Sequence, residues 1–196
     1  MPPRRKEQTA AAAAASKQSK DTVSVIIPSA IYLGPCSSAS STSFLTTHSI
    51  NHVLSIGITP SPKVDGVTYH RLALNDSVTS SITSTMDSAI NIINDALKSN
   101  KGRGRILIHC SAGASRSPTV VVGYLMKERG MSLKAALGHV VRARPQVSPN
   151  HGFLEQLKTL EQELYGVKTL EINALPRREV DRLALFNDSA DAVAAG

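Results

Sequence analysis

One loop of the sequence gathers a thiol, a guanidinium and several hydroxyls. Residues 109–117 read His-Cys-Ser-Ala-Gly-Ala-Ser-Arg-Ser and follow the apolar run Ile106-Leu107-Ile108. Small residues separate Cys110 from Arg116, six positions later. A loop of this kind between a strand and a helix can turn its backbone N–H groups inward and form a nest for negative charge. The pattern predicts a phosphate cradle with a sulfur nucleophile at its floor. The predicted loop comprises Ser111, Ala112, Gly113, Ala114, Ser115 and Arg116.

Cys110 is placed where a thiol ionises readily. Helix N-termini and nearby cations lower a cysteine pKa from about 8.5 to roughly 3.5–7.5, and the helix expected from about Ser117 adds its positive dipole end. Arg116 offers a planar fork of donors for two oxygens, which a lysine would lack. Ser117 can donate its hydroxyl to the sulfur. We expect His109 to fix the loop and assist thiolate formation, and not to act as the base.

The loop lacks the lysine of a Walker motif, Gly-x-x-x-x-Gly-Lys-Ser/Thr, whose hydroxyl would hold magnesium. It therefore suits attack by sulfur on phosphorus, with no metal and no cofactor. A buried cysteine is often an inert structural residue, and small-residue turns are common between strands and helices. Those readings explain Cys110 or Gly113 singly, but not a cysteine, an arginine and a hydroxyl at this spacing.

The loop, His-Cys-x5-Arg-Ser, resembles the signature of the dual-specificity protein phosphatases, and the resemblance covers about residues 23–165. Residues 31–34 (Ile-Tyr-Leu-Gly) are similar to the opening strand of that family. Residues 50–56 (Ile-Asn-His-Val-Leu-Ser-Ile) are similar to a later strand, and residues 144–157 to the family's closing segment. The resemblance implies a phosphatase that acts on phosphotyrosine and on phosphoserine or phosphothreonine in proteins, through a phosphocysteine.

The same resemblance implies two further site residues. Asp76, in Leu74-Asn75-Asp76-Ser77, matches the family's general acid, which protonates the leaving oxygen. From the sequence alone it is equally well a turn residue, because Asn-Asp-Ser favours turns. Asn150 matches a position that braces the phosphate loop, and after Pro149 it is also a good helix N-cap.

Length and composition favour one α/β domain with two tails. The 196 residues carry a net charge of +7 and contain no Trp and three Phe, so the core must be aliphatic. A basic protein favours acidic partners, and a phosphorylated protein substrate fits this charge. No aromatic-studded basic face predicts specific nucleic-acid binding. The oligomeric state is left open.

Two cysteines, Cys36 and Cys110, do not make a disulfide framework, and whether they pair on oxidation is left open. The sequence has no signal-peptide pattern and no run of membrane-spanning length. These features predict a reducing compartment, the cytoplasm, with no membrane association. Residues 4–6 (Arg-Arg-Lys) could add a nuclear address, although a solvated tail is the simpler interpretation.

Alternating apolar patterns predict a mostly parallel central sheet in a single domain, with helices on both faces. Residues 1–22 read as a disordered tail, residues 23–166 as the catalytic domain, and residues 167–196 as an extension with a short helix that packs on the domain or docks a partner. Strands are expected at 23–27, 30–33, 52–56, 67–74 and 105–109, and helices at 40–47, 82–97, 117–127, 132–140 and 153–164.

The leading hypothesis is hydrolysis of phosphorylated proteins. A phosphoinositide, a phosphorylated glycan or an RNA 5′ phosphate is an alternative substrate, although residues 111–115 carry no lysine for a highly charged head group. A phosphate-binding adaptor without turnover is less consistent with the presence of both Cys110 and Arg116. Arg142 and Arg144 could line a second anion site, or lie on a solvated helix face.

Overall fold

The computed structural model describes residues 22–186. Its helices pack against a five-stranded sheet. The strands are β1 (Ser24–Ile27), β2 (Ile31–Gly34), β3 (His52–Ile56), β4 (Thr68–Leu72) and β5 (Ile106–His109). The helices are the 3-10 helix η1 (Cys36–Ser40), α2 (Thr42–Thr47), α3 (Thr83–Gly102), α4 (Arg116–Arg129), α5 (Leu133–Ala143), α6 (His151–Tyr165) and α7 (Glu179–Ala184). The disordered tail expected at residues 1–22 lies outside the described residues, except for Thr22.

The strand order is β1-β2-β5-β3-β4, with β5 at the centre and only β1 antiparallel to its neighbour. The parallel strands β2, β5, β3 and β4 therefore end at one edge of the sheet. Loops that follow such strands form the ligand-binding crevice of open α/β sheets. The predicted mostly parallel sheet is confirmed, and it brings the loops after Gly34, Ile56, Leu72 and His109 together.

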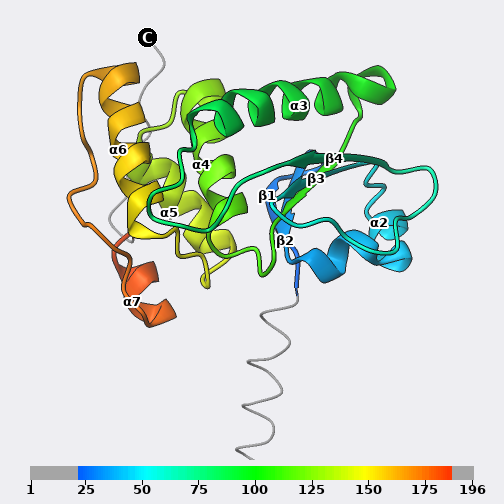
Figure 1. Cartoon of the computed structure of the whole chain (residues 1–196), viewed down its shortest axis with the longest axis horizontal. Helices are drawn as coiled ribbons and strands as arrows, with labels where there is room; N and C mark the ends of the chain where they lie inside the picture. The colour runs from blue at the N-terminus through cyan, green and yellow to red at the C-terminus, as the bar shows by residue number, and fades with distance from the viewer. Residues whose placement is uncertain (1–21, 187–196) are drawn as a thin grey trace, which may run out of the picture.

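Side chains alternate between the two faces of the sheet, as strand geometry requires. On β5, Ile106 and Ile108 belong to the larger buried cluster with α3 to α6, whereas Leu107 belongs to a smaller cluster with Leu45 of α2. Figure 1 shows α2 on the side of the strands opposite α3. Helices cover both faces, as predicted, but four long helices share one face and only η1 and α2 cover the other.

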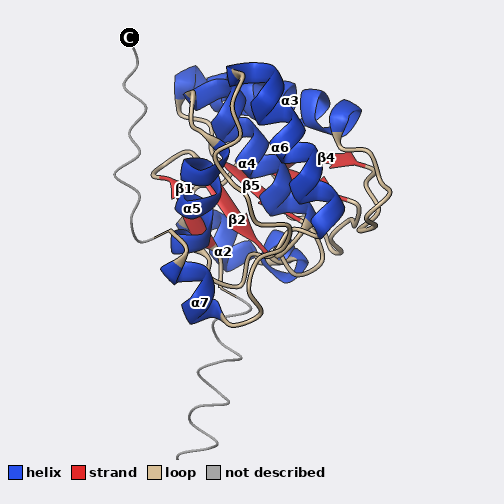
Figure 2. Ribbon diagram, turned by 90° about the vertical axis from the view of Figure 1, so that its left-hand side faces the viewer, coloured by secondary structure: helices blue, strands red, loops and turns tan. Residues whose placement is uncertain are grey.

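The segment after α6 returns to the domain and packs on it. Phe186 is 1% exposed and lies against Gly138 of α5, and Figure 2 shows α7 beside α5. Arg182, which is also buried, donates from Nε to the Pro145 carbonyl at 2.7 Å. The short helix expected in this segment is present, and its buried contacts favour packing on the domain over docking of a partner.

Helix α3 ends later than the sequence predicts. It was expected to stop near residue 97, yet helical hydrogen bonding reaches Gly102 across residues 99–101, whose backbone is not helical. Asn100 and Lys101 have positive φ angles of 49° and 59°. The residues between the predicted helix and the strand at 105–109 thus begin with a tight left-handed turn appended to the helix. None of the described helices is long and apolar enough to cross a membrane.

That turn lies beside a pair of histidines, His52 on β3 and His70 on the edge strand β4. Nδ1 of His52 lies 3.3 Å from Nε2 of His70, and Nε2 of His52 lies 2.9 Å from Oγ of Ser99. Because Ser99 Oγ donates to the Ala96 carbonyl at 2.6 Å, it accepts from His52 Nε2–H. When both rings are neutral, the unprotonated Nδ1 of His52 accepts from Nε2–H of His70.

Burial lowers the pKa of both His52 and His70, and the Asp95 carboxylate partly opposes this at His70. In the unfolded chain a histidine has a pKa of about 6.5. As the pH falls below that value, the unfolded chain takes up protons that the folded chain does not. The free energy of unfolding therefore decreases with falling pH.

We expect His70→Gln to flatten this pH dependence, because the glutamine amide can still donate to His52 but does not titrate. Thermal unfolding between about pH 7.5 and about pH 5.5 measures the effect. His151→Gln, which removes an exposed histidine, serves as the control and should retain the wild-type slope. An unchanged slope in His70→Gln would show that the histidine pair does not set the acid sensitivity.

Candidate active site

The predicted loop leaves the central strand at the carboxyl edge of the sheet. Cys110 follows β5 directly, and the chain turns through residues 111–115 before α4 begins at Arg116. Gly113 has a φ of +66°, and a Cβ there would overlap the carbonyl oxygen of Gly34 at the end of β2. Glycine is therefore required at this turn for two reasons, its backbone angle and its close approach to the neighbouring strand.

All the carbonyls from Ser111 to Ser115 accept hydrogen bonds from other parts of the domain. The donors are Cys36 N to Ser111 O (3.0 Å), Arg144 Nη2 to Ala112 O (3.0 Å), Arg144 Nε to Gly113 O (2.9 Å), Ser148 N to Ala114 O (2.7 Å) and Thr119 N to Ser115 O (3.1 Å). In a trans peptide unit the N–H points away from the carbonyl. Fixing these carbonyls outward turns the N–H groups toward the centre of the loop.

Cys110 Sγ receives two of those N–H groups, from Gly113 and Ala114, together with that of Ser117. The side chain is 2% exposed. Burial raises the pKa of the Cys110 thiol, but hydrogen bonds from the Ser117 hydroxyl and from the N–H groups of Ser117, Gly113 and Ala114 lower it further, so that its pKa lies below the usual value. The expected contact from Ser117 Oγ to Sγ measures 3.3 Å. The loop therefore favours a thiolate although the sulfur is buried.

His109 points away from the cradle and is fully buried. Its Nδ1 lies 3.1 Å from the Cys110 carbonyl, which can only accept, so Nδ1 carries the proton. Its Nε2 accepts from the Ser55 hydroxyl at 2.8 Å. Burial lowers the pKa of His109, which agrees with a neutral ring. As expected from the sequence, its geometry is that of a fixing residue.

Arg116 is the first residue of α4, and its guanidinium lies beside the strand edge. Its buried Nε has no hydrogen-bond partner among the described residues, although Oδ2 of Asp76 lies 3.6 Å away. At Gly57, after β3, a Cβ would overlap Arg116 Nη1. The guanidinium is thus placed by a glycine on one side and attracted by a carboxylate on the other, with donor capacity remaining for an anion.

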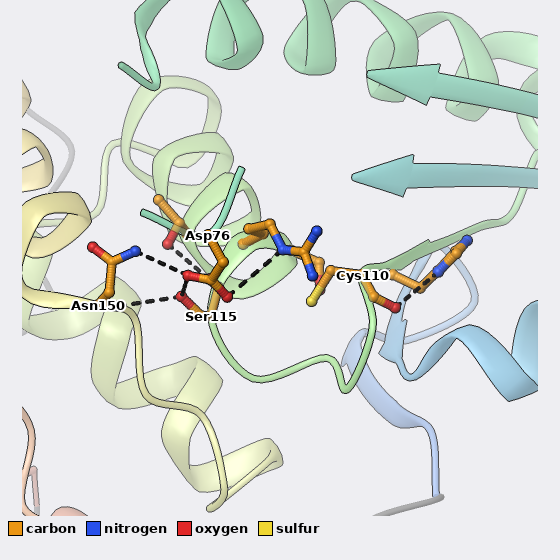
Figure 3. A network of polar contacts seen from close by, with 8 residues as sticks. Asp76, Cys110, Ser115 and Asn150 are labelled. Atoms are coloured by element: carbon orange, nitrogen blue, oxygen red, sulfur yellow. Dashed lines mark hydrogen bonds and ion pairs between the residues drawn. The ribbon is translucent and has the colours of Figure 1, made fainter. Parts of the chain in front are cut away.

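Asp76, Ser115 and Asn150 form one polar cluster at the rim, and Figure 3 shows the three side chains pointing toward one another. Asp76 Oδ1 accepts from Ser115 Oγ at 2.8 Å and from Asn150 Nδ2 at 2.9 Å. The Asn150 backbone N–H also donates to Ser115 Oγ at 3.2 Å. The residue expected to brace the loop therefore contacts both the loop and the candidate acid.

Asn150 also caps α6, because its Oδ1 accepts from the Phe153 N–H at 3.0 Å. Both roles considered for this residue are present in the structure. Asp76 is not a plain turn residue, since its carboxylate faces the loop and Arg116. The structure thus brings Asp76 and Asn150 to the loop of Cys110, Arg116 and Ser117, with His109 packed behind that loop.

One interpretation of the sequence was wrong. Arg144 was considered for a second anion site or a solvated helix face, but it is 1% exposed and its guanidinium holds two loop carbonyls. Arg142 donates to the Phe186 carbonyl at 3.0 Å. The two arginines follow each other closely in sequence, and only their tertiary contacts distinguish them.

The sequence reasoning also missed Ser55 and Gly57. Ser55 is the one polar residue in the otherwise apolar run Val53-Leu54-Ser55-Ile56, and that isolation was an available signal. Gly57 follows the strand predicted at 52–56, and no role in the site was predicted for it. Within residues 22–186, no group of three His, Cys, Asp or Glu side chains is placed to hold a metal ion.

Comparison with known proteins identifies similar chains. The sequence model described as "Dual specificity phosphatase, catalytic domain" matches residues 31–163. Dual specificity protein phosphatase 1 of Arabidopsis thaliana is 35% identical over 145 residues, which are 74% of this chain and 72% of the relative. Human dual specificity protein phosphatase 5 is 38% identical over 135 residues, which are 68% of this chain and 34% of the relative.

Solved structures agree with this comparison. Human DUSP28 superposes with a TM-score of 0.66 at 28% identity, and covers 72% of this chain and 94% of its own. A mouse putative dual specificity phosphatase complexed with zinc tungstate superposes with a TM-score of 0.68 at 28% identity, over 74% of this chain and 90% of its own.

The two roles of Asn150 can be separated by substitution. Asn150→Ala removes the α6 cap and should lower the free energy of unfolding by about 1 kcal/mol. Asn150→Ser retains a capping oxygen but, like alanine, lacks the amide that donates to Asp76, and should be close to wild type. Urea unfolding compares the two. Equal losses would show that the bond to Asp76, and not the cap, contributes the stability.

Proposed function

The chain belongs to the dual specificity phosphatase family, and we propose that it hydrolyses phosphotyrosine as well as phosphoserine and phosphothreonine on proteins. The family membership makes it a cysteine-based protein phosphatase. The observation that carries the finer proposal is the loop itself, in which inward N–H groups and the Ser117 hydroxyl surround Cys110 Sγ. The same N–H groups would bind the non-bridging oxygens of a phosphate group.

In the first step, the Cys110 thiolate attacks phosphorus and forms a sulfur–phosphorus bond. The bond from phosphorus to the substrate oxygen breaks, and the leaving oxygen takes its electron pair. Asp76, in its protonated form, gives its proton to that oxygen. Arg116, whose Nε is buried without a hydrogen-bond partner among the described residues, binds two phosphate oxygens as their charge develops.

In the second step, water attacks the phosphorus of the phosphocysteine. Asp76, now a carboxylate, accepts a proton from that water, and the sulfur–phosphorus bond breaks to release inorganic phosphate. The sulfur leaves as a thiolate, which the Ser117 hydroxyl stabilises from 3.3 Å. Ser115 and Asn150 hold Asp76 in place for both proton transfers.

The charge of the loop supports a protein substrate. The side chains of Ser111 to Ser115 are uncharged, so the cradle offers backbone N–H groups and one guanidinium. This set suits a single phosphate group, whereas a polyphosphorylated head group would gain from further cations. We further propose that the protein works in a reducing compartment, because the mechanism needs a free Cys110 thiolate.

The decisive measurement is release of phosphate from matched phosphotyrosine and phosphothreonine peptides, in the presence of a chelator and a reductant. We expect release from both, and none from Cys110→Ser, which should still bind the peptides because the loop N–H groups remain. Release from phosphotyrosine alone would contradict dual specificity. If a folded, reduced protein released phosphate from neither, the protein-substrate proposal would be wrong, and phosphoinositides, phosphorylated glycans and 5′-phosphorylated RNA would be tried.

The role of Asp76 predicts a dependence on the leaving group. Asp76→Asn keeps the acceptor for Ser115 and Asn150 but cannot deliver a proton, so turnover of phosphothreonine peptides should fall by about 100-fold. An aryl phosphate whose leaving group is a weak base should be affected much less. Asp87→Asn, a change at an exposed acid that pairs with Lys127, is the control and should leave both rates unchanged. Equal slowing of both substrates by Asp76→Asn would refute its role as the acid.

A further inference from the structure

Arg144 is a buried cation behind the phosphate loop. It follows α5 as its C-cap, is 1% exposed, and its side chain extends to the main chain of residues 112 and 113. It also donates from Nη1 to the Thr22 carbonyl, before β1. Placing a guanidinium in the interior has a substantial desolvation cost, so the contacts that it makes there need a physical explanation.

Arg144 donates to the carbonyls of two peptide units whose N–H groups face the Cys110 sulfur. The unit between residues 112 and 113 presents its carbonyl to Arg144 Nη2 at 3.0 Å and its N–H, that of Gly113, to Cys110 Sγ. The next unit presents the Gly113 carbonyl to Arg144 Nε at 2.9 Å and the Ala114 N–H to the same sulfur. Because a peptide unit is planar, the orientation of one end fixes that of the other.

We propose that Arg144 is a positioning residue for the nucleophile, which keeps the Gly113 and Ala114 N–H groups directed at Cys110 Sγ by holding the carbonyls of the same two peptide units. This inference rests on the proposed function only in taking Cys110 as the nucleophile. A hydrogen bond from a cation also polarises each carbonyl, which strengthens the N–H at the other end as a donor.

Among the described residues, Arg144 is the one whose side chain donates to the carbonyls of residues 111–114. The Ser111 and Ala114 carbonyls are held by backbone N–H groups, those of Cys36 and Ser148. Those anchors persist whatever side chain stands at the donor, whereas both bonds of Arg144 disappear on substitution. The forked guanidinium reaches two carbonyls at once, and an ammonium group, as a single point, suits only one.

The pKa of Cys110, measured from the pH dependence of its alkylation by iodoacetamide, tests the inference without any turnover. Mass spectrometry resolves Cys110 from Cys36. We expect Arg144→Met, which keeps much of the volume but has no donors, to raise this pKa by about one unit or more, so that alkylation below the pKa slows roughly tenfold. The other titratable or charged groups around the sulfur, Cys36, Asp76, His109 and Arg116, are the same in both proteins.

Arg182→Met is the matched control. Arg182 is likewise a buried arginine and donates to the main-chain carbonyls of Pro145, Pro176 and Arg177, none of which belongs to the loop. Its loss should lower the free energy of unfolding but leave the pKa of Cys110 unchanged. If Arg182→Met raised that pKa as much as Arg144→Met does, general loosening would explain the effect and the inference would fail.

Arg144→Lys separates charge from orientation. It keeps the positive charge but not the fork, so we expect the pKa of Cys110 to rise here too. A wild-type pKa in this variant, with a raised one in Arg144→Met, would mean that charge alone acts and would overturn a positioning role.

If Arg144→Met does not fold, the lysine variant and the wild-type amide spectrum remain as tests. In the wild type, the amide protons of Gly113 and Ala114 should shift as Cys110 titrates, and their failure to shift would overturn the inference. The two proposals fail separately: a low Cys110 pKa that depends on Arg144, in a protein that releases no phosphate from any substrate, would refute only the proposed function.

Discussion

The planarity of the peptide unit is the constraint on which this molecule depends. A loop can direct a series of N–H groups at one buried sulfur only if its carbonyls are satisfied on the outside. Here the partners come from η1, from the end of α5, from the segment before α6 and from the first turn of α4. The parallel sheet places the loop at the edge where these elements meet. The surrounding elements therefore supply the hydrogen-bond donors that the carbonyls of residues 111–115 need.

The electrostatics of the site follow from the same arrangement. Burial disfavours a charged sulfur, and the hydrogen bonds to it reverse that balance. Burial lowers the pKa of His109, and the ring is fixed by its contacts with the Cys110 carbonyl and Ser55. The candidate acid is kept at the rim, where Ser115 and Asn150 hold it. The Cys110 sulfur and the Asp76 carboxylate therefore lie in separate environments, the sulfur buried among hydrogen-bond donors and the carboxylate exposed to solvent.

The parts of this arrangement that are local in sequence could be predicted from it. The strand, the small-residue turn and the helix around Cys110 and Arg116 are encoded within a few residues, and the alternation of apolar residues predicts the sheet. The contact between Asp76 and Asn150 spans 74 positions, so only the family resemblance selected both residues. Arg144 was misassigned because a charged residue at a helix end is usually solvated, and no local signal reports that a loop carbonyl lies beneath it.

The return of the chain after α6 changes what counts as one unit of this protein. The match to the family model ends at residue 163, yet Leu170, Leu175 and Phe186 lie in the same buried cluster as the strands. Arg182 ties this stretch to Pro145, next to the arginine that anchors the loop. A chimaera that ended at residue 163 would lose these side chains and expose the apolar residues that they cover. The transferable module therefore extends at least to Phe186, beyond the end of the match to the family model.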